Sequence, residues 1–227
     1  MNAQAMNFPL LPASLSVLAL LGTAAAALAI AIAIAVALAT GRSVWARRLI
    51  LSGLGLAAVY GLALGGFALS SDEVSLPRGA EKYFCEIDCH LAYAVTSAER
   101  GIALPGVAPQ HGEFWRVRLR TRFDETTISA RRGREVPLTP NPREVAIVDA
   151  RGQRYPPVTV PVTDDGSVAL GTPLRPGEGY VTTLFFDLPR DASTPRLLVS
   201  EGVPEALVLI DNEKSFLHRK TYFALAP

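Results

Sequence analysis

The sequence has almost no charge in its first third and lacks the common catalytic motifs. Residues 14–40 and residues 49–70 contain no charged side chain, so neither run offers an interior group that could carry an ion or relay a proton. The chain has no phosphate-binding loop, no His-Glu-x-x-His motif and no Gly-x-Ser-x-Gly elbow. No pattern nominates a catalytic residue, and we expect a protein that is not an enzyme.

The two uncharged runs are long enough to cross a lipid bilayer. A helix rises about 1.5 Å per residue, and the hydrocarbon core is roughly 30 Å thick. We therefore predict transmembrane helices at 14–40 and 49–70. A cleaved signal peptide is the alternative for the first run, but the run is too long, no basic region precedes it, and a second run follows. An uncleaved anchor is the better interpretation.

Three arginines set the expected orientation of this anchor. Arg42, Arg47 and Arg48 lie between the two runs, in residues 41–48, and no basic residue precedes the first run. By the positive-inside rule this loop is cytoplasmic. We expect residues 1–13 and the polar remainder of the chain to face the periplasm of a bacterial inner membrane.

Small residues recur along one face of the second run. Gly53, Ala57, Gly61 and Gly65 follow one another at four-residue steps, which lets another helix approach closely. The partner is either the alanine-rich first run or a helix of another integral membrane protein. The sequence does not decide between these two.

The remaining residues have the composition of one soluble domain. Residues 78–227 are enough to bury a core without the help of disulfides or metals. Of 22 Lys and Arg residues three lie in the loop, which leaves 19 against 21 Asp and Glu. This balance and the expected compartment argue against nucleic acid as a partner. We predict a linker at 71–90 and a domain at 91–227.

The pattern of the domain is that of an all-β fold. In residues 114–123 apolar side chains alternate with Arg116, Arg118, Arg120 and Arg122, as in a half-buried antiparallel strand. Turns are expected at 149–153 and 175–178. Further strands are predicted at 91–95, 144–150, 153–155, 180–188, 196–200, 206–210 and 216–225. This number and spacing of strands predict an antiparallel sandwich.

Three short stretches resemble a known family. Leu-Arg-Pro-Gly-Glu-Gly-Tyr at 174–180, Phe-Phe-Asp-Leu-Pro at 185–189 and Leu-Leu-Val at 197–199 resemble the end of telokin-like immunoglobulin-fold domains. Such domains occur on many bacterial membrane and secreted proteins and usually bind or scaffold. The resemblance implies an immunoglobulin-like sandwich and speaks less to function.

Both cysteines of the chain lie in one short segment. Cys85 and Cys89 are four residues apart, and His90 follows directly. A disulfide is the favoured interpretation in an oxidising compartment. Alternatively, two thiolates and an imidazole would bind copper or zinc. Free thiols are the third interpretation. The spacing resembles the copper loop of oxidase subunit II, but Tyr93 and Thr96 stand where that family has ligands.

These observations lead to two functional expectations. The first is a non-catalytic accessory subunit that packs by its helices on a respiratory or photosynthetic membrane complex. The four arginines would then contact a partner or anionic lipids, unless neighbouring carboxylates pair with them. The alternative is a tethered copper-binding or copper-delivery protein that uses Cys85, Cys89 and His90.

Overall fold

The chain forms two compact units, each described here by itself. The computed structural model describes residues 4–85, 89–129, 132–160 and 166–225. One unit is a β domain built from the first seven residues, residues 72–204 and residues 220–227. The other is a helical unit built from residues 8–71 and residues 205–219. Each unit therefore combines segments that lie far apart in the sequence.

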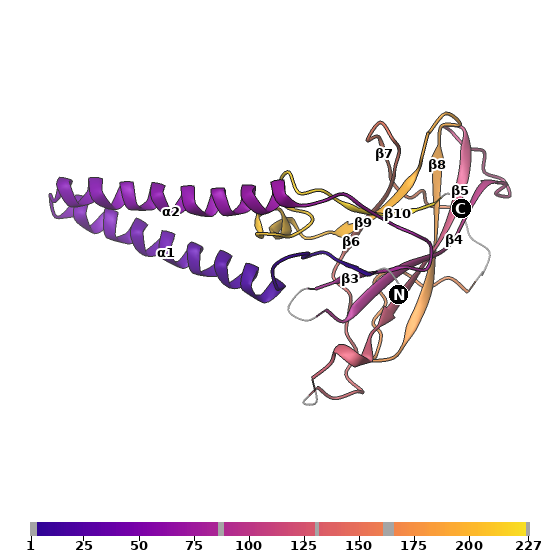
Figure 1. The fold of residues 1–227 in the computed structure, drawn as a ribbon, viewed down its shortest axis with the longest axis horizontal. Helices are drawn as coiled ribbons and strands as arrows, with labels where there is room; N and C mark the ends of the chain where they lie inside the picture. Colours follow the sequence, from indigo (N-terminus) through magenta and orange to yellow (C-terminus); the bar gives the residue numbers. More distant parts are fainter. Residues whose placement is uncertain (1–3, 86–88, 130–131, 161–165, 226–227) are drawn as a thin grey trace. The chain divides into compact units, whose positions relative to one another are not determined.

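The helical unit contains two long apolar helices, α1 (Ala13–Ala39) and α2 (Ser43–Ser70), which contact each other as a hairpin (Figure 1). Both are long and apolar enough to cross a membrane. The connection is shorter than predicted: Arg47 and Arg48 lie in the first turns of α2. Only residues 40–42 separate the helices, because Gly41 adopts a positive φ of 71° that closes a tight turn.

Residues 205–219 complete the helical unit and correct two predicted strands. The predicted strand at 206–210 is instead the 3₁₀ helix η2 (Pro204–Val208) followed by turns. Of the predicted strand at 216–225 only β10 (Thr221–Ala224) forms. Alternation of side chains is not enough here, since residues 206–219 pair with no strand in the described part of the chain.

The β domain consists of two five-stranded sheets. The order in the first sheet is β1-β3-β4-β5-β8 and in the second β2-β10-β9-β6-β7. Most pairs are antiparallel, but β1 with β3 and β2 with β10 are parallel. The bounds of the first sheet are Gln4–Met6, Glu81–Phe84, Leu91–Ile102, Glu113–Phe123 and Gly179–Leu188. Those of the second, in the same order as above, are Val74–Leu76, Thr221–Ala224, Arg196–Glu201, Arg143–Val148 and Arg154–Tyr155.

Side chains from both sheets share one apolar core. Val117 and Leu119 of β5 and Leu197 and Val199 of β9 are fully buried in the same cluster. A buried lysine also links the sheets: Lys82 of β3 donates from Nζ to the carbonyl oxygen of Val199, 2.7 Å away. The apolar alternation predicted for 114–123 thus corresponds to the inward face of β5.

Two predicted connecting segments belong to the sheets. The tail at 1–13 contains β1, and the linker at 71–90 contains β2 and β3. Their strands are three or four residues long and pair with residues distant in the sequence, so local patterning gives little sign of them. The β domain therefore begins before the helices and resumes directly after them.

Candidate functional site

The cysteine segment forms a disulfide. Cys85 and Cys89 are joined, with their Cα atoms 4.0 Å apart, as the favoured interpretation predicted. Cys85 follows β3 and is buried. The Asn7 side chain holds its backbone: Oδ1 accepts from the amide of Cys85 at 2.7 Å, and Nδ2 donates to its carbonyl at 3.2 Å. The disulfide thus lies beside the attachment of the N-terminal segment.

The imidazole of His90 packs against an aromatic ring and a threonine hydroxyl. Its ring is buried, stacks on Phe123 with the centroids 5.3 Å apart, and places Nδ1 2.6 Å from Oγ1 of Thr127. Among the described residues no three His, Cys, Asp or Glu side chains form a group that could hold a metal ion. Metal binding by Cys85, Cys89 and His90 stays a hypothesis for the reduced chain.

The arginine row of β5 is largely paired with carboxylates. Arg116 donates to Glu99, directly across from it on β4. Arg120 and Arg122 both contact Glu81, with nitrogen to oxygen distances of 3.2 and 2.8 Å. Arg118 is exposed. This arrangement favours the structural interpretation of the row for three of its four members.

Arg122 is the centre of a compact polar cluster. Its guanidinium donates to Glu81, to Asp124 and to the hydroxyl of Tyr83, which itself donates to Asp124 at 2.7 Å. Burial, and then the hydrogen bond to Asp124, raises the pKa of Tyr83. Burial also acts to raise the pKa of Asp124, but hydrogen bonds from Tyr83, Thr126 and Arg122 outweigh it and hold this pKa well below its usual range. The cluster therefore stabilises the fold through charge.

The four small residues of α2 do not all face α1. A Cβ added at Gly53 would lie 3.5 Å from Cγ2 of Ile30. At Gly61 and Gly65 an added Cβ would meet no described atom within 4 Å. Ala57, between Gly53 and Gly61, is exposed. Within the described part of the chain, the half of this row nearer the end of α2 is thus open to another helix.

Residues 205–219 are attached to both helices, which the sequence did not predict. The Tyr60 hydroxyl of α2 donates to the carbonyl of Val208 at 2.7 Å, and the Ser16 hydroxyl of α1 donates to that of Ile210. The buried carboxylate of Asp211 accepts from the amides of Leu10 and Leu11 at 2.7 and 2.6 Å. The sequence signal was a polar Asp-Asn-Glu-Lys-Ser run between apolar residues.

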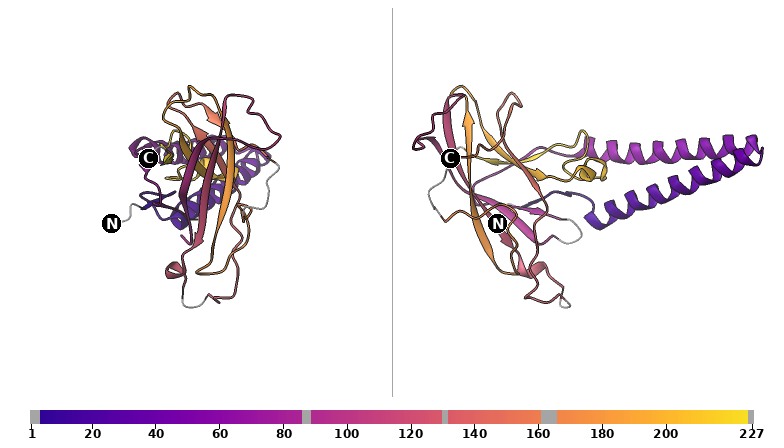
Figure 2. Two further views of the ribbon diagram at one scale, coloured as in Figure 1. Left: turned by 90° about the vertical axis from the view of Figure 1, so that its right-hand side faces the viewer. Right: turned by 180° about the vertical axis from the view of Figure 1, so that it is seen from behind.

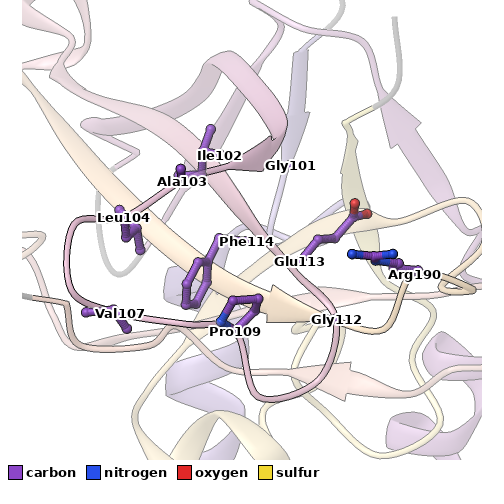
Figure 3. Close-up of a pocket in the computed structure, with 10 residues that line it drawn as sticks. All are labelled: Gly101, Ile102, Ala103, Leu104, Val107, Pro109, Gly112, Glu113, Phe114 and Arg190. Carbon is purple, nitrogen blue, oxygen red and sulfur yellow. The ribbon is translucent and has the colours of Figure 1, made fainter.

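A surface hollow of about 350 Å³ lies beside the β4–β5 connection. Figure 3 shows Glu113 and Arg190 on one side of it and Leu104, Val107 and Phe114 on the other. Glu113 is already paired with Arg100. The described lining therefore supplies no nucleophile with an adjacent base.

Comparison with known proteins gives only weak structural similarity. No protein-family model matches the chain, and no curated protein matches it. The secreted protein MPT63 of Mycobacterium tuberculosis matches with a TM-score of 0.43 and 15% identity, covering 68% of this chain and 99% of its own. The yjhA protein of Bacillus subtilis matches with a TM-score of 0.41 and 11% identity, covering 66% of this chain and 98% of its own.

Similarity at this level carries no argument about fold or function. The architecture rests on the chain's own structure: two long apolar helices near the N-terminus and a β domain with two sheets. The immunoglobulin-like and telokin-like assignments remain predictions from sequence.

Proposed function

We propose that the chain is a non-catalytic accessory subunit of a larger inner-membrane complex of the respiratory or photosynthetic type. Its helical hairpin packs against helices of integral membrane subunits, with lipids around the rest of the hairpin. Its β domain covers part of the periplasmic face of the complex. The observation that carries the proposal is the open stretch of α2 at Gly61 and Gly65, together with the exposed apolar surface of both helices.

The physical argument concerns the membrane as a solvent. Lipid tails are as apolar as leucine, so apolar side chains alone give two helices little reason to associate in a bilayer. Small residues allow close backbone approach, which gains packing contacts that lipid does not supply. An open row of glycine on a helix that otherwise carries exposed Leu62 and Leu69 therefore favours a protein neighbour at that row.

The proposal is tested by replacing the open glycines. In Gly61→Leu/Gly65→Leu, we expect the recovery of partner subunits after mild detergent extraction and affinity purification to fall at least tenfold, because leucine holds the backbones apart. Quantitative mass spectrometry of the purified material measures this recovery.

The matched control is Gly55→Leu, since an added Cβ at Gly55 also meets no described atom but lies off the four-residue row. This control should keep its partners. Equal recovery from both variants would contradict the row as the contact surface, and recovery of the wild-type chain alone would contradict the accessory role.

A further inference from the structure

We propose that residues 205–219 form a membrane-interface segment that places Val208, Phe216 and Leu217 in the outer leaflet, beside the ends of α1 and α2. The occupant of this surface is the lipid bilayer itself. The inference rests on the proposed membrane anchor and adds a third contact with the membrane, made by a segment near the other end of the chain. Figures 1 and 2 show this yellow segment next to the ends of both helices.

The depth of the segment follows from its hydrogen bond to Tyr60. Tyr60 lies 19 residues after Gly41, so its Cα is about 28 Å along the hairpin from the turn. Side chains of a helix lean toward its N-terminus, which for α2 is the end at the turn. A hydrocarbon core of roughly 30 Å that starts anywhere between Gly41 and Arg48 therefore reaches the level of Tyr60. The Val208 carbonyl bonded to this hydroxyl lies at the same level.

Hydrogen bonds to both helices, or to residues next to them, hold the segment at the level of Tyr60. The Ser16 hydroxyl binds the carbonyl of Ile210, Asp211 accepts from two amides that precede α1, and the amide of Arg219 donates to Oγ of Ser71 at 2.9 Å. These bonds satisfy polar groups where water is scarce, which is the requirement at the edge of a bilayer.

Five side chains of the segment are exposed: those of Val208, Phe216 and Leu217 are apolar, and those of Glu205 and Arg219 are charged and suit the headgroup region. Phe216 is 59% exposed, Leu217 76% and Val208 38%. Leu217 has a φ of 63°, a conformation that is unfavourable for leucine, within a turn that exposes the consecutive apolar residues Phe216 and Leu217. In water such a turn exposes two large apolar groups and stores strain. Against lipid, burial of these groups offsets the strain.

Depth-dependent fluorescence quenching tests the inference on the full-length chain. In a Trp45→Phe background, Phe216→Trp is reconstituted into vesicles of phosphatidylethanolamine and phosphatidylglycerol that contain brominated phosphatidylcholine. Trp115 is buried in the β domain and contributes a constant signal. We expect at least twofold stronger quenching by bromine near the headgroup than by bromine near the end of the acyl chain.

Two matched variants separate the possible failures. Val136→Trp replaces an exposed apolar residue of the β domain and should show no quenching. Leu28→Trp replaces an exposed residue in the middle of α1 and should be quenched best by deep bromine. Quenching at position 28 without quenching at 216 would overturn the interface segment and leave the anchor intact. Absence of quenching at both positions would overturn the anchor as well.

Discussion

At the scale of single residues, charge is used mainly to hold the β domain together. Arg122 binds Glu81 through both Nε and a terminal nitrogen and also reaches Asp124. A guanidinium that binds a carboxylate in this two-bond geometry is held more rigidly than a single surface ion pair. The arginine row that the sequence offered as a contact surface is thus committed in large part to its own sheet.

The cluster predicts a pH dependence of stability. The pKa of Asp124 is lower in the folded chain than its unfolded value near 4, so its charge stabilises the fold above about pH 4, and this contribution is lost as the pH falls further. Asp124→Asn should lower the free energy of unfolding by about 2 kcal/mol at pH 7. It should also flatten the decline in stability below pH 4. Urea unfolding followed by circular dichroism at several pH values measures both effects.

The control for this prediction is Asp191→Asn. Asp191 is exposed and pairs with Arg151 at 3.3 Å on the surface, so its replacement should change stability by less than about 0.5 kcal/mol. An Asp124 variant with the acid profile of the wild type would contradict the role of the cluster.

The sequence predicted a contact between residues that are close together in the chain. It did not predict the contacts between residues that are far apart in the chain. The disulfide joins residues four apart, and its favoured pairing is confirmed. Asp211 bonds amides about 200 residues away, and Asn7 bonds Cys85 at a separation of 78. No local pattern specifies such pairs, so these attachments emerged only from the folded chain.

At the scale of elements, length and alternation decided what could be predicted. The two helices and β5 are long and strongly patterned, and they occur within a few residues of the predicted bounds, apart from the early start of α2. Strands β1, β2 and β3 are short, and they form through hydrogen bonds to neighbouring strands in the sheets. Residues 206–210 show the reverse case, in which a strand-like sequence without a partner strand forms a 3₁₀ turn.

The side chain of Asn7, directly after β1, adds to the backbone pairing of β1 with β3. Asn7 is buried, bonds both polar backbone groups of Cys85 and also contacts Glu201. Asn7→Ala should cost about 2 kcal/mol and release β1 from β3, because the backbone amide of Cys85 loses its acceptor. Hydrogen exchange followed by mass spectrometry should show faster exchange in residues 5–7.

Met6→Ala is the control, since Met6 is 48% exposed and its backbone pairing does not depend on the side chain. Exchange in residues 5–7 should be unchanged in this variant. Equal exchange in the Asn7 variant and the wild type would show that β1 does not need this side chain.

At the scale of the whole molecule, the first sheet restricts the path of the chain. Strand β1 precedes α1, β3 follows α2, and the two strands are hydrogen-bonded neighbours. Both ends of the hairpin must therefore be on the same side of any membrane that it crosses. This requirement is independent of the arginines and fits either orientation, so the orientation itself stays a prediction of the positive-inside rule.

Labelling with a membrane-impermeant maleimide tests this topology. In spheroplasts Val136→Cys, an exposed position of the β domain, should be labelled. Ser43→Cys, at the turn between the helices, should be labelled only after lysis. Labelling of Ser43→Cys but not of Val136→Cys in intact spheroplasts would reverse the orientation, and failure to label either variant before lysis would contradict a hairpin that crosses the membrane.

The pairing of β1 with β3 also imposes an order in time. Each residue of β1 pairs with a residue of β3 that is made 77 positions later, after both helices have left the ribosome. At 5–20 residues per second this delay is on the order of 4–15 s. During this delay β1 lacks its partner β3, and the two strands pair only after both helices have been synthesised. The two helices are therefore synthesised before the first sheet of the β domain can form completely.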